Sequence, residues 1–183
     1  LTKQLTTKTN LIMEHQKPKT GKFALNYGLI LGLVMISIAV IMYVTGMALE
    51  GVQWPNYLYY IIFPVVIFYA IGQYKKANAN VLSLGDALKV GVAIAVISAI
   101  VYVLYGFIFN YVIDPEFMAQ ALDVAKDKML ENPNMTEEQV EQSIKMIEMF
   151  TNPLIGSAFW IAMSALFGLI WSLIAGLVMK NNS

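Results

Sequence analysis

Residues 84–112 read LGDALKVGVAIAVISAIVYVLYGFIFNYV and form one long apolar segment. From Val90 to Val112 the segment carries no charged side chain. A helix needs about 20 mostly apolar residues to cross about 30 Å of hydrocarbon. The bilayer offers no water to satisfy an open backbone, so a lone segment of this kind must pair its backbone groups internally, as a helix does. The segment therefore predicts a transmembrane helix.

Three further segments have the same apolar character, at residues 23–49, 57–73 and 153–179. Of the 183 residues, 58% are hydrophobic and 13% are charged, whereas soluble domains carry about 25% charged residues. We therefore expect an all-α integral membrane protein with four transmembrane helices. Its predicted parts are a basic tail of residues 1–22 and a single four-helix membrane domain of residues 23–183.

The distribution of charge predicts the direction of insertion, because cytoplasmic flanks are enriched in positive charge. Residues 114–152 hold nine acidic residues against three lysines, so this segment is predicted to be extracytoplasmic. Both termini are predicted to be cytoplasmic, because most other lysines flank the spans on that side: Lys3, Lys8, Lys17, Lys19, Lys22, Lys75, Lys76 and Lys180. Interfacial aromatic belts at the outer edge agree with this direction: Trp54, Tyr57, Tyr59, Tyr60, Tyr105 and Tyr111.

The residue types that are missing exclude many functions. The chain has no Arg, no Cys and one histidine, His15, and its 12 basic and 12 acidic residues give no net charge. Without guanidinium groups nucleic-acid binding is disfavoured, and without thiols there is no disulfide or Cys-type zinc site. Acid–base chemistry would rest on Asp86, Asp114 and Glu116 alone. We expect no cofactor, no metal and no enzymatic activity.

The acidic segment of residues 114–152 carries the start and stop signals of two helices. Asp114 and Pro115 are typical of an N-cap followed by proline at the first helical position, and Glu116 would lie at the positive end of the helix dipole. Asn132-Pro133-Asn134 ends this helix, and the spacing of Thr136 and Gln139 predicts a capping box for the next. Apolar residues recur along both at helical spacing. We expect an amphipathic helical hairpin.

The apolar stripes of this hairpin need a partner surface. They can pack on each other and on the ends of the spans, or they can dock another envelope protein. Insertion into anionic lipid is less favoured, because helices that do so are usually rich in lysine. The methionines of the segment are better explained as flexible packing residues than as metal ligands.

Small residues repeat every four positions on two spans, through Gly28 and Gly32 on the first and Gly168 and Gly176 on the fourth. Such stripes let helix backbones approach closely in a membrane. They predict packing within one four-helix bundle, or a homo-oligomer contact through a stripe that the bundle leaves free.

Asp86 and Lys89 are the only charges within the predicted spans, near the start of the third apolar stretch. Ser83 and Asp86 have the spacing of a capped helix start, and Lys89 can extend back to the interface. The alternative is an ion or proton relay at the inner mouth of a transporter.

The order of several motifs resembles a known family. These are Asn26-Tyr27-Gly28 with Gly32, and the runs LGDALKVG at 84–91, IDPEF at 113–117 and MTEEQ at 135–139. Together they resemble domain of unknown function 4199 (DUF4199), a family of small membrane proteins found chiefly in the Bacteroidetes. The resemblance implies a four-span inner-membrane protein of a Gram-negative envelope, with no assigned activity and no catalytic residue.

The function predicted from these features is that of a non-catalytic accessory or scaffold subunit in the bilayer, which packs or docks through its acidic outer hairpin. The alternative is a small transporter or ion channel with Asp86 and Lys89 near its inner mouth.

Overall fold

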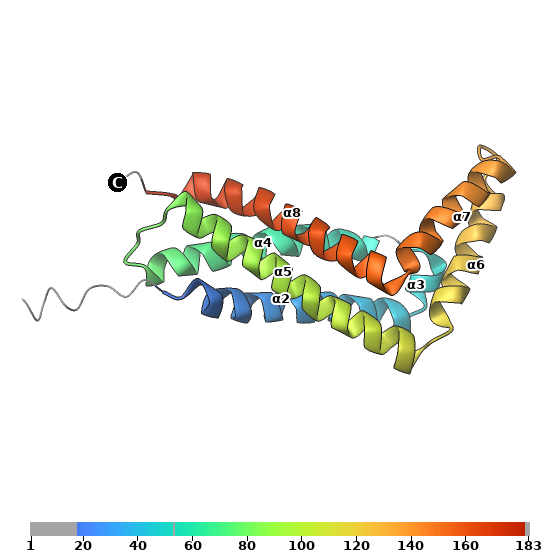
Figure 1. The fold of residues 1–183 in the computed structure, drawn as a ribbon, viewed down its shortest axis with the longest axis horizontal. Helices are drawn as coiled ribbons and strands as arrows, with labels where there is room; N and C mark the ends of the chain where they lie inside the picture. The colour runs from blue at the N-terminus through green and yellow to red at the C-terminus, as the bar shows by residue number, and fades with distance from the viewer. Residues whose placement is uncertain (1–17, 53, 182–183) are drawn as a thin grey trace, which may run out of the picture.

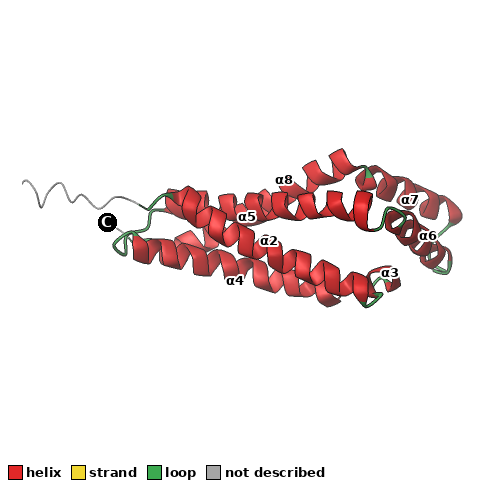
Figure 2. Ribbon diagram, turned by 90° about the horizontal axis from the view of Figure 1, so that it is seen from below, coloured by secondary structure: helices red, strands yellow, loops and turns green. Residues whose placement is uncertain are grey.

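The computed structural model describes residues 18–52 and 54–181, which form helices joined by short connections and contain no strand (Figure 2). Most of the predicted basic tail, including His15, lies outside the described residues. Four helices are long and apolar enough to cross a membrane, so the all-α prediction with four spans is confirmed. They are α2 (Thr20–Val44), α4 (Trp54–Ala77), α5 (Leu84–Ile108) and α8 (Pro153–Met179).

The first two long helices differ from their predicted bounds. α2 ends at Val44 rather than 49, because Gly46 has a left-handed backbone with φ of 76°, and the short helix α3 (Met47–Glu50) follows. α4 continues past residue 73 to Ala77, and its last turn holds Lys75 and Lys76. Positive charge is favourable at that end of a helix, although hydropathy alone places the end of the span before the lysines.

The third span changes its helix type before it ends. α5 begins as predicted, since the Ser83 hydroxyl oxygen accepts the Asp86 backbone N–H at 3.1 Å. It continues into a π-helical turn, η1 (Phe109–Ile113), and the Asp114 N–H donates to the Phe109 carbonyl at 2.9 Å. Such π-helical turns are rare in proteins, and those that occur are often found at functional sites.

The four long helices form a bundle in which α5 is central (Figure 1). α5 packs along α2 and α8, and α4 contacts both of these helices. Two shorter helices, α6 (Phe117–Leu130) and α7 (Glu137–Thr151), join η1 to α8 as the predicted hairpin. We call the half of the bundle near residues 18 and 181 the terminal half, and the half near α6 and α7 the hairpin half. The terminal half comprises residues 20–33, 63–77, 84–99 and 165–179.

The core of the terminal half depends on glycines that let backbones touch. A Cβ at Gly28 would lie 2.7 Å from the Ile97 Cβ, and one at Gly168 would lie 2.5 Å from the Ala95 Cβ. Gly32 and Gly176 are equally close to side chains of α5. The predicted stripes are thus occupied by contacts within one chain. The fully buried hydrophobic core residues lie around them: Ala24, Leu31, Ile67, Ala70, Ile71, Tyr74, Ala87, Val90, Ile94, Ala95, Ala99 and Ala175.

Candidate functional site

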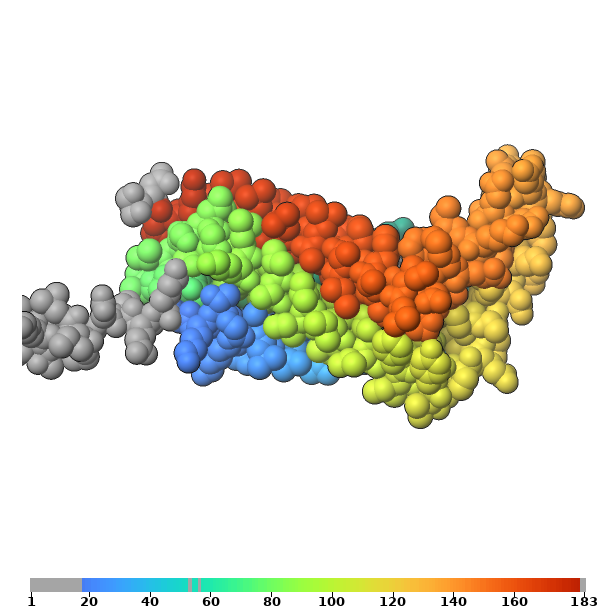
Figure 3. Space-filling view, in the orientation of Figure 1, coloured from blue at the N-terminus to red at the C-terminus, as the bar shows by residue number. Residues whose placement is uncertain are grey.

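The hairpin of α6 and α7 stands at the end of the bundle, and its tip extends beyond the bundle edge (Figures 1 and 3). The two helices pack on each other. The predicted capping box opens α7, because the Gln139 N–H donates to the Thr136 Oγ1 at 3.3 Å and the Thr136 N–H donates to the Gln139 Oε1 at 2.9 Å. These two bonds define where α7 begins.

The predicted start of α6 is wrong. Asp114 does not cap the helix and Pro115 is not its first residue, because α6 begins at Phe117 with Glu116 at the N-cap position. The Asp114 Oδ2 instead accepts the hydroxyl of Tyr43 at 2.9 Å. Asp114 follows the π-helical turn with φ of −146° and ψ of 85°, and the long-range partner Tyr43 replaces a local one.

The hairpin joins the bundle at the start of α6 and at the end of α7. An aromatic cluster holds the first of these two ends. The rings of Tyr43, Phe109 and Phe117 meet edge to face, with centroids 4.9 to 5.5 Å apart. This geometry is favourable because the edge of one ring faces the electron-rich face of another. Farther along α6, the Lys128 ammonium donates to the carbonyl of Glu50 at the end of α3. α6 is thereby held against two parts of the bundle.

The other end of the hairpin, where α7 meets α8, is held by a helix cap and a ring contact. The Asn152 side chain accepts the N–H groups of Leu154 and Ile155 at 3.1 and 3.3 Å and so caps α8. The Phe150 and Phe159 rings are tilted by 52° to each other, with centroids 4.8 Å apart across the α7–α8 junction. The hairpin is therefore attached at both ends, and it is not a loose loop.

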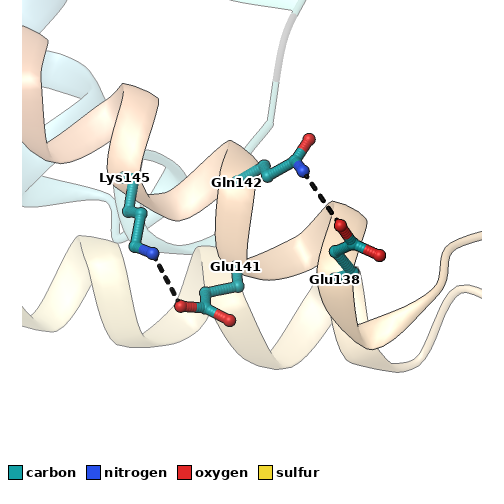
Figure 4. Close-up of polar contacts among 4 residues, drawn as sticks. All are labelled: Glu138, Glu141, Gln142 and Lys145. Carbon is teal, nitrogen blue, oxygen red and sulfur yellow. Dashed lines mark hydrogen bonds and ion pairs between the residues drawn. The ribbon is translucent and has the colours of Figure 1, made fainter.

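The hairpin surface combines negative charge with exposed apolar side chains. Lys145 forms an ion pair of 2.7 Å with Glu141, and the Gln142 amide donates to Glu138 at 3.4 Å (Figure 4). The Lys145 ammonium lowers the pKa of Glu141, and Glu141 in turn raises the pKa of Lys145. Five large apolar residues keep at least a third of their surface exposed: Met118, Leu130, Met146, Met149 and Phe150.

Asp86 and Lys89 lie at the opposite end of the molecule and in different environments. Asp86 is 5% exposed, and its Oδ2 accepts the Ser83 hydroxyl at 2.7 Å. Lys89 is exposed. Among the described residues no cluster of His, Cys, Asp and Glu could hold a metal ion.

A cavity of about 680 Å³ lies in the hairpin half, and sequence reasoning missed it. Residues of all four long helices and of α3 and α6 line it, and six of them are tyrosines: Tyr43, Tyr57, Tyr59, Tyr60, Tyr102 and Tyr105. A second cavity of about 540 Å³ lies below the hairpin, between η1 and the start of α8. Tyr102, Asn110 and Trp160 line both cavities.

The comparison with known proteins places the chain in a family. A family model described as a protein of unknown function (DUF4199) matches residues 26–181, which is nearly the whole chain. The chain belongs to this family. No curated protein and no solved structure matches it. Membership of DUF4199 assigns no activity, so the site has to be judged by its own chemistry.

The DUF4199 chain brings some of its predicted site residues together and separates others. Asp114 lies where the hairpin begins and pairs with Tyr43, whereas Asp86 and Lys89 lie near the start of α5 in the terminal half. Asn110, Tyr102 and Trp160 were not predicted as site residues. The signal for them is weak in sequence, because aromatic residues near the ends of a span are also typical of interfacial belts.

Proposed function

We propose that this DUF4199 protein is a non-catalytic accessory or scaffold subunit of the bacterial inner membrane, and that its hairpin docks another envelope protein. The observation that carries this proposal is the hairpin itself. It is attached to the bundle at both ends and keeps large apolar side chains exposed. Exposed apolar patches with a polar rim are typical of protein interaction sites.

The charge of the hairpin indicates the chemistry of the partner. Residues 114–152 carry nine acidic residues against three lysines, so a basic surface with an apolar centre would be complementary. Anionic lipid would be repelled by the same charge. The partner is therefore a protein with exposed Lys or Arg around an apolar patch.

The proposed topology has both termini in the cytoplasm. The start of α2, the α4–α5 connection and the end of α8 share one end of the bundle (Figure 1), and the lysines of these segments lie there. The acidic hairpin is at the other end, which fits the enrichment of positive charge on cytoplasmic flanks.

The alternative of a transporter using Asp86 and Lys89 has less support. Asp86 is engaged at the start of α5, Lys89 is exposed, and neither residue lines either of the two cavities in the hairpin half.

Topology is tested with single cysteines, since the chain has none of its own. Glu138→Cys in the hairpin should react with a membrane-impermeant maleimide added to intact cells whose outer membrane has been permeabilised. The matched variant Ala79→Cys, in the α4–α5 connection, should react only after the inner membrane is opened. The reverse pattern would overturn the proposed orientation.

Docking is tested with a photocrosslinking residue at position 146 in native membranes. We expect a discrete crosslinked complex with one envelope protein, which raised salt weakens. The same residue at position 178, which is 72% exposed on α8, is the control and should not give this complex. Equal crosslinking from both positions, or no complex from position 146, would contradict docking through the hairpin.

A further inference from the structure

Two residues of the wall shared by the two cavities, Asn110 and Trp160, each carry a buried polar atom. The Asn110 Oδ1 and the Trp160 Nε1 are inaccessible to solvent and have no hydrogen-bond partner among residues 18–52 and 54–181. Both residues line both cavities. A buried polar atom without a partner costs about 1 to 3 kcal/mol, so this pair indicates a group that binds there.

The orientation of the Asn110 amide is fixed by its other end. Its Nδ2 donates to the carbonyl of Gly106 at 2.8 Å, at the point where α5 passes into η1. The oxygen is therefore the free end, and it requires a donor. The Trp160 indole N–H is a donor and requires an acceptor. A hydroxyl group can serve as both.

The remaining lining limits the ligand to an uncharged molecule. No charged residue lines either cavity, and the walls are mostly aromatic and aliphatic. An ionised head group would lose its hydration without gaining a counter-charge. The volume of about 680 Å³ falls within the range of small-molecule sites, roughly 300 to 1,000 Å³.

We propose that the cavity of the hairpin half binds a neutral single-chain lipid with a hydroxyl head, of the monoacylglycerol type. The acyl chain occupies the space between the methionines and tyrosines of α2, α4 and α5. On binding, the glycerol hydroxyls displace the side chains that cover these two atoms, donate to the Asn110 Oδ1 and accept from the Trp160 Nε1. The site is separate from the docking surface and does not depend on it.

The test is native mass spectrometry of the full chain in a detergent without hydroxyl groups, with added monoolein as the probe. We expect one monoolein per chain. Oleate, which has a charged head, and oleoyl lysophosphatidylcholine, which has a quaternary ammonium, should bind at least tenfold more weakly. Equal binding of either competitor would overturn the assignment of the head group.

Variants separate the cavity from nonspecific lipid binding. Trp160→Phe keeps an aromatic ring but removes the donor, and Asn110→Leu removes the acceptor, so each should weaken binding about tenfold. Gly106→Leu should abolish binding, because Gly106 lines both cavities and a Cβ there meets no atom within 4 Å. Its control is Gly72→Leu, which also has open space but lies outside both cavities.

A melting temperature for each variant checks that the bundle is folded. Monoolein binding by Gly106→Leu at the wild-type level would overturn the proposal, as would its loss in a folded Gly72→Leu. If Gly106→Leu does not fold, wild-type binding by both Trp160→Phe and Asn110→Leu overturns it instead.

Discussion

The terminal half and the hairpin half of the bundle use the same four helices but pack them differently. In the terminal half, small residues let backbones touch, and a Cβ at Gly91 would lie 2.3 Å from the Ser172 Cβ. In the hairpin half, tyrosines and Trp160 face one another around a cavity of about 680 Å³. Small side chains thus let the helices touch and leave no space between them, whereas large planar side chains hold the helices apart.

This difference follows from how helices associate in lipid. The hydrocarbon is as apolar as the side chains, so association depends on close packing and hydrogen bonds. The terminal half gains that packing directly. The hairpin half replaces it with ring contacts, with the Tyr43–Asp114 hydrogen bond, and with a cover made by α3 and α6.

The largest effect is expected where the packing is tightest. Gly168→Val should lower the free energy of unfolding by about 3 kcal/mol, because its Cβ would lie 2.5 Å from the Ala95 Cβ and 3.2 Å from the Gly91 carbonyl oxygen. Denaturation in mixed micelles measures the change. Gly72→Val, which meets nothing within 4 Å, is the control. A comparable loss in the control would remove the contrast between packed and open positions.

The next effect concerns the base of the hairpin. Tyr43→Phe keeps the ring contacts with Phe109 and Phe117 but removes the hydrogen bond to Asp114. We expect a local loss of about 1.5 kcal/mol, seen as faster amide hydrogen exchange at the start of α6. Tyr111→Phe makes the same change at a side chain that is 61% exposed, and should have no effect. Unchanged exchange in Tyr43→Phe would show that the rings alone fix the hairpin.

A smaller effect of opposite sign is expected in the hairpin half. Gly106→Ala should raise the free energy of unfolding by about 0.5 to 1 kcal/mol, because alanine is the better helix former and its Cβ enters open space. The same change at Gly91 should be destabilising. Micelle denaturation of both variants tests the pair, and a loss at both positions would contradict the difference between the halves.

The smallest effect is a pH dependence on the hairpin surface. Lys145 lowers the pKa of Glu141 in the folded state, so the pair stabilises α7 above the pKa of the unfolded carboxyl. This contribution is lost as the pH falls through the lower, folded pKa. Both groups are exposed, so the gain is slight. A carboxyl NMR titration should show that Lys145→Gln returns the Glu141 pKa toward its ordinary value, and an unchanged titration would exclude the pair in solution.

Much of the candidate site could be read from the sequence, but only where the cause is local. The capping box of Thr136 and Gln139 and the cap at Ser83 form within one helical turn, and both are present. The cap predicted for Asp114 is absent. Asp114 pairs instead with Tyr43, which lies 71 positions away in the sequence, so no local pattern indicates this contact. Tyr59 and Tyr105 have the positions of belt residues, yet they line a cavity.

The sequence by itself determined the four apolar helices, the hairpin and the family, because span length, helix periodicity and capping depend on neighbours along the chain. Only the tertiary structure decided which glycines meet α5, where the π-helical turn places Asn110, and that Trp160 shares a cavity wall with it. These are contacts between separate helices. They depend on how the helices are rotated and spaced, and no local pattern fixes either.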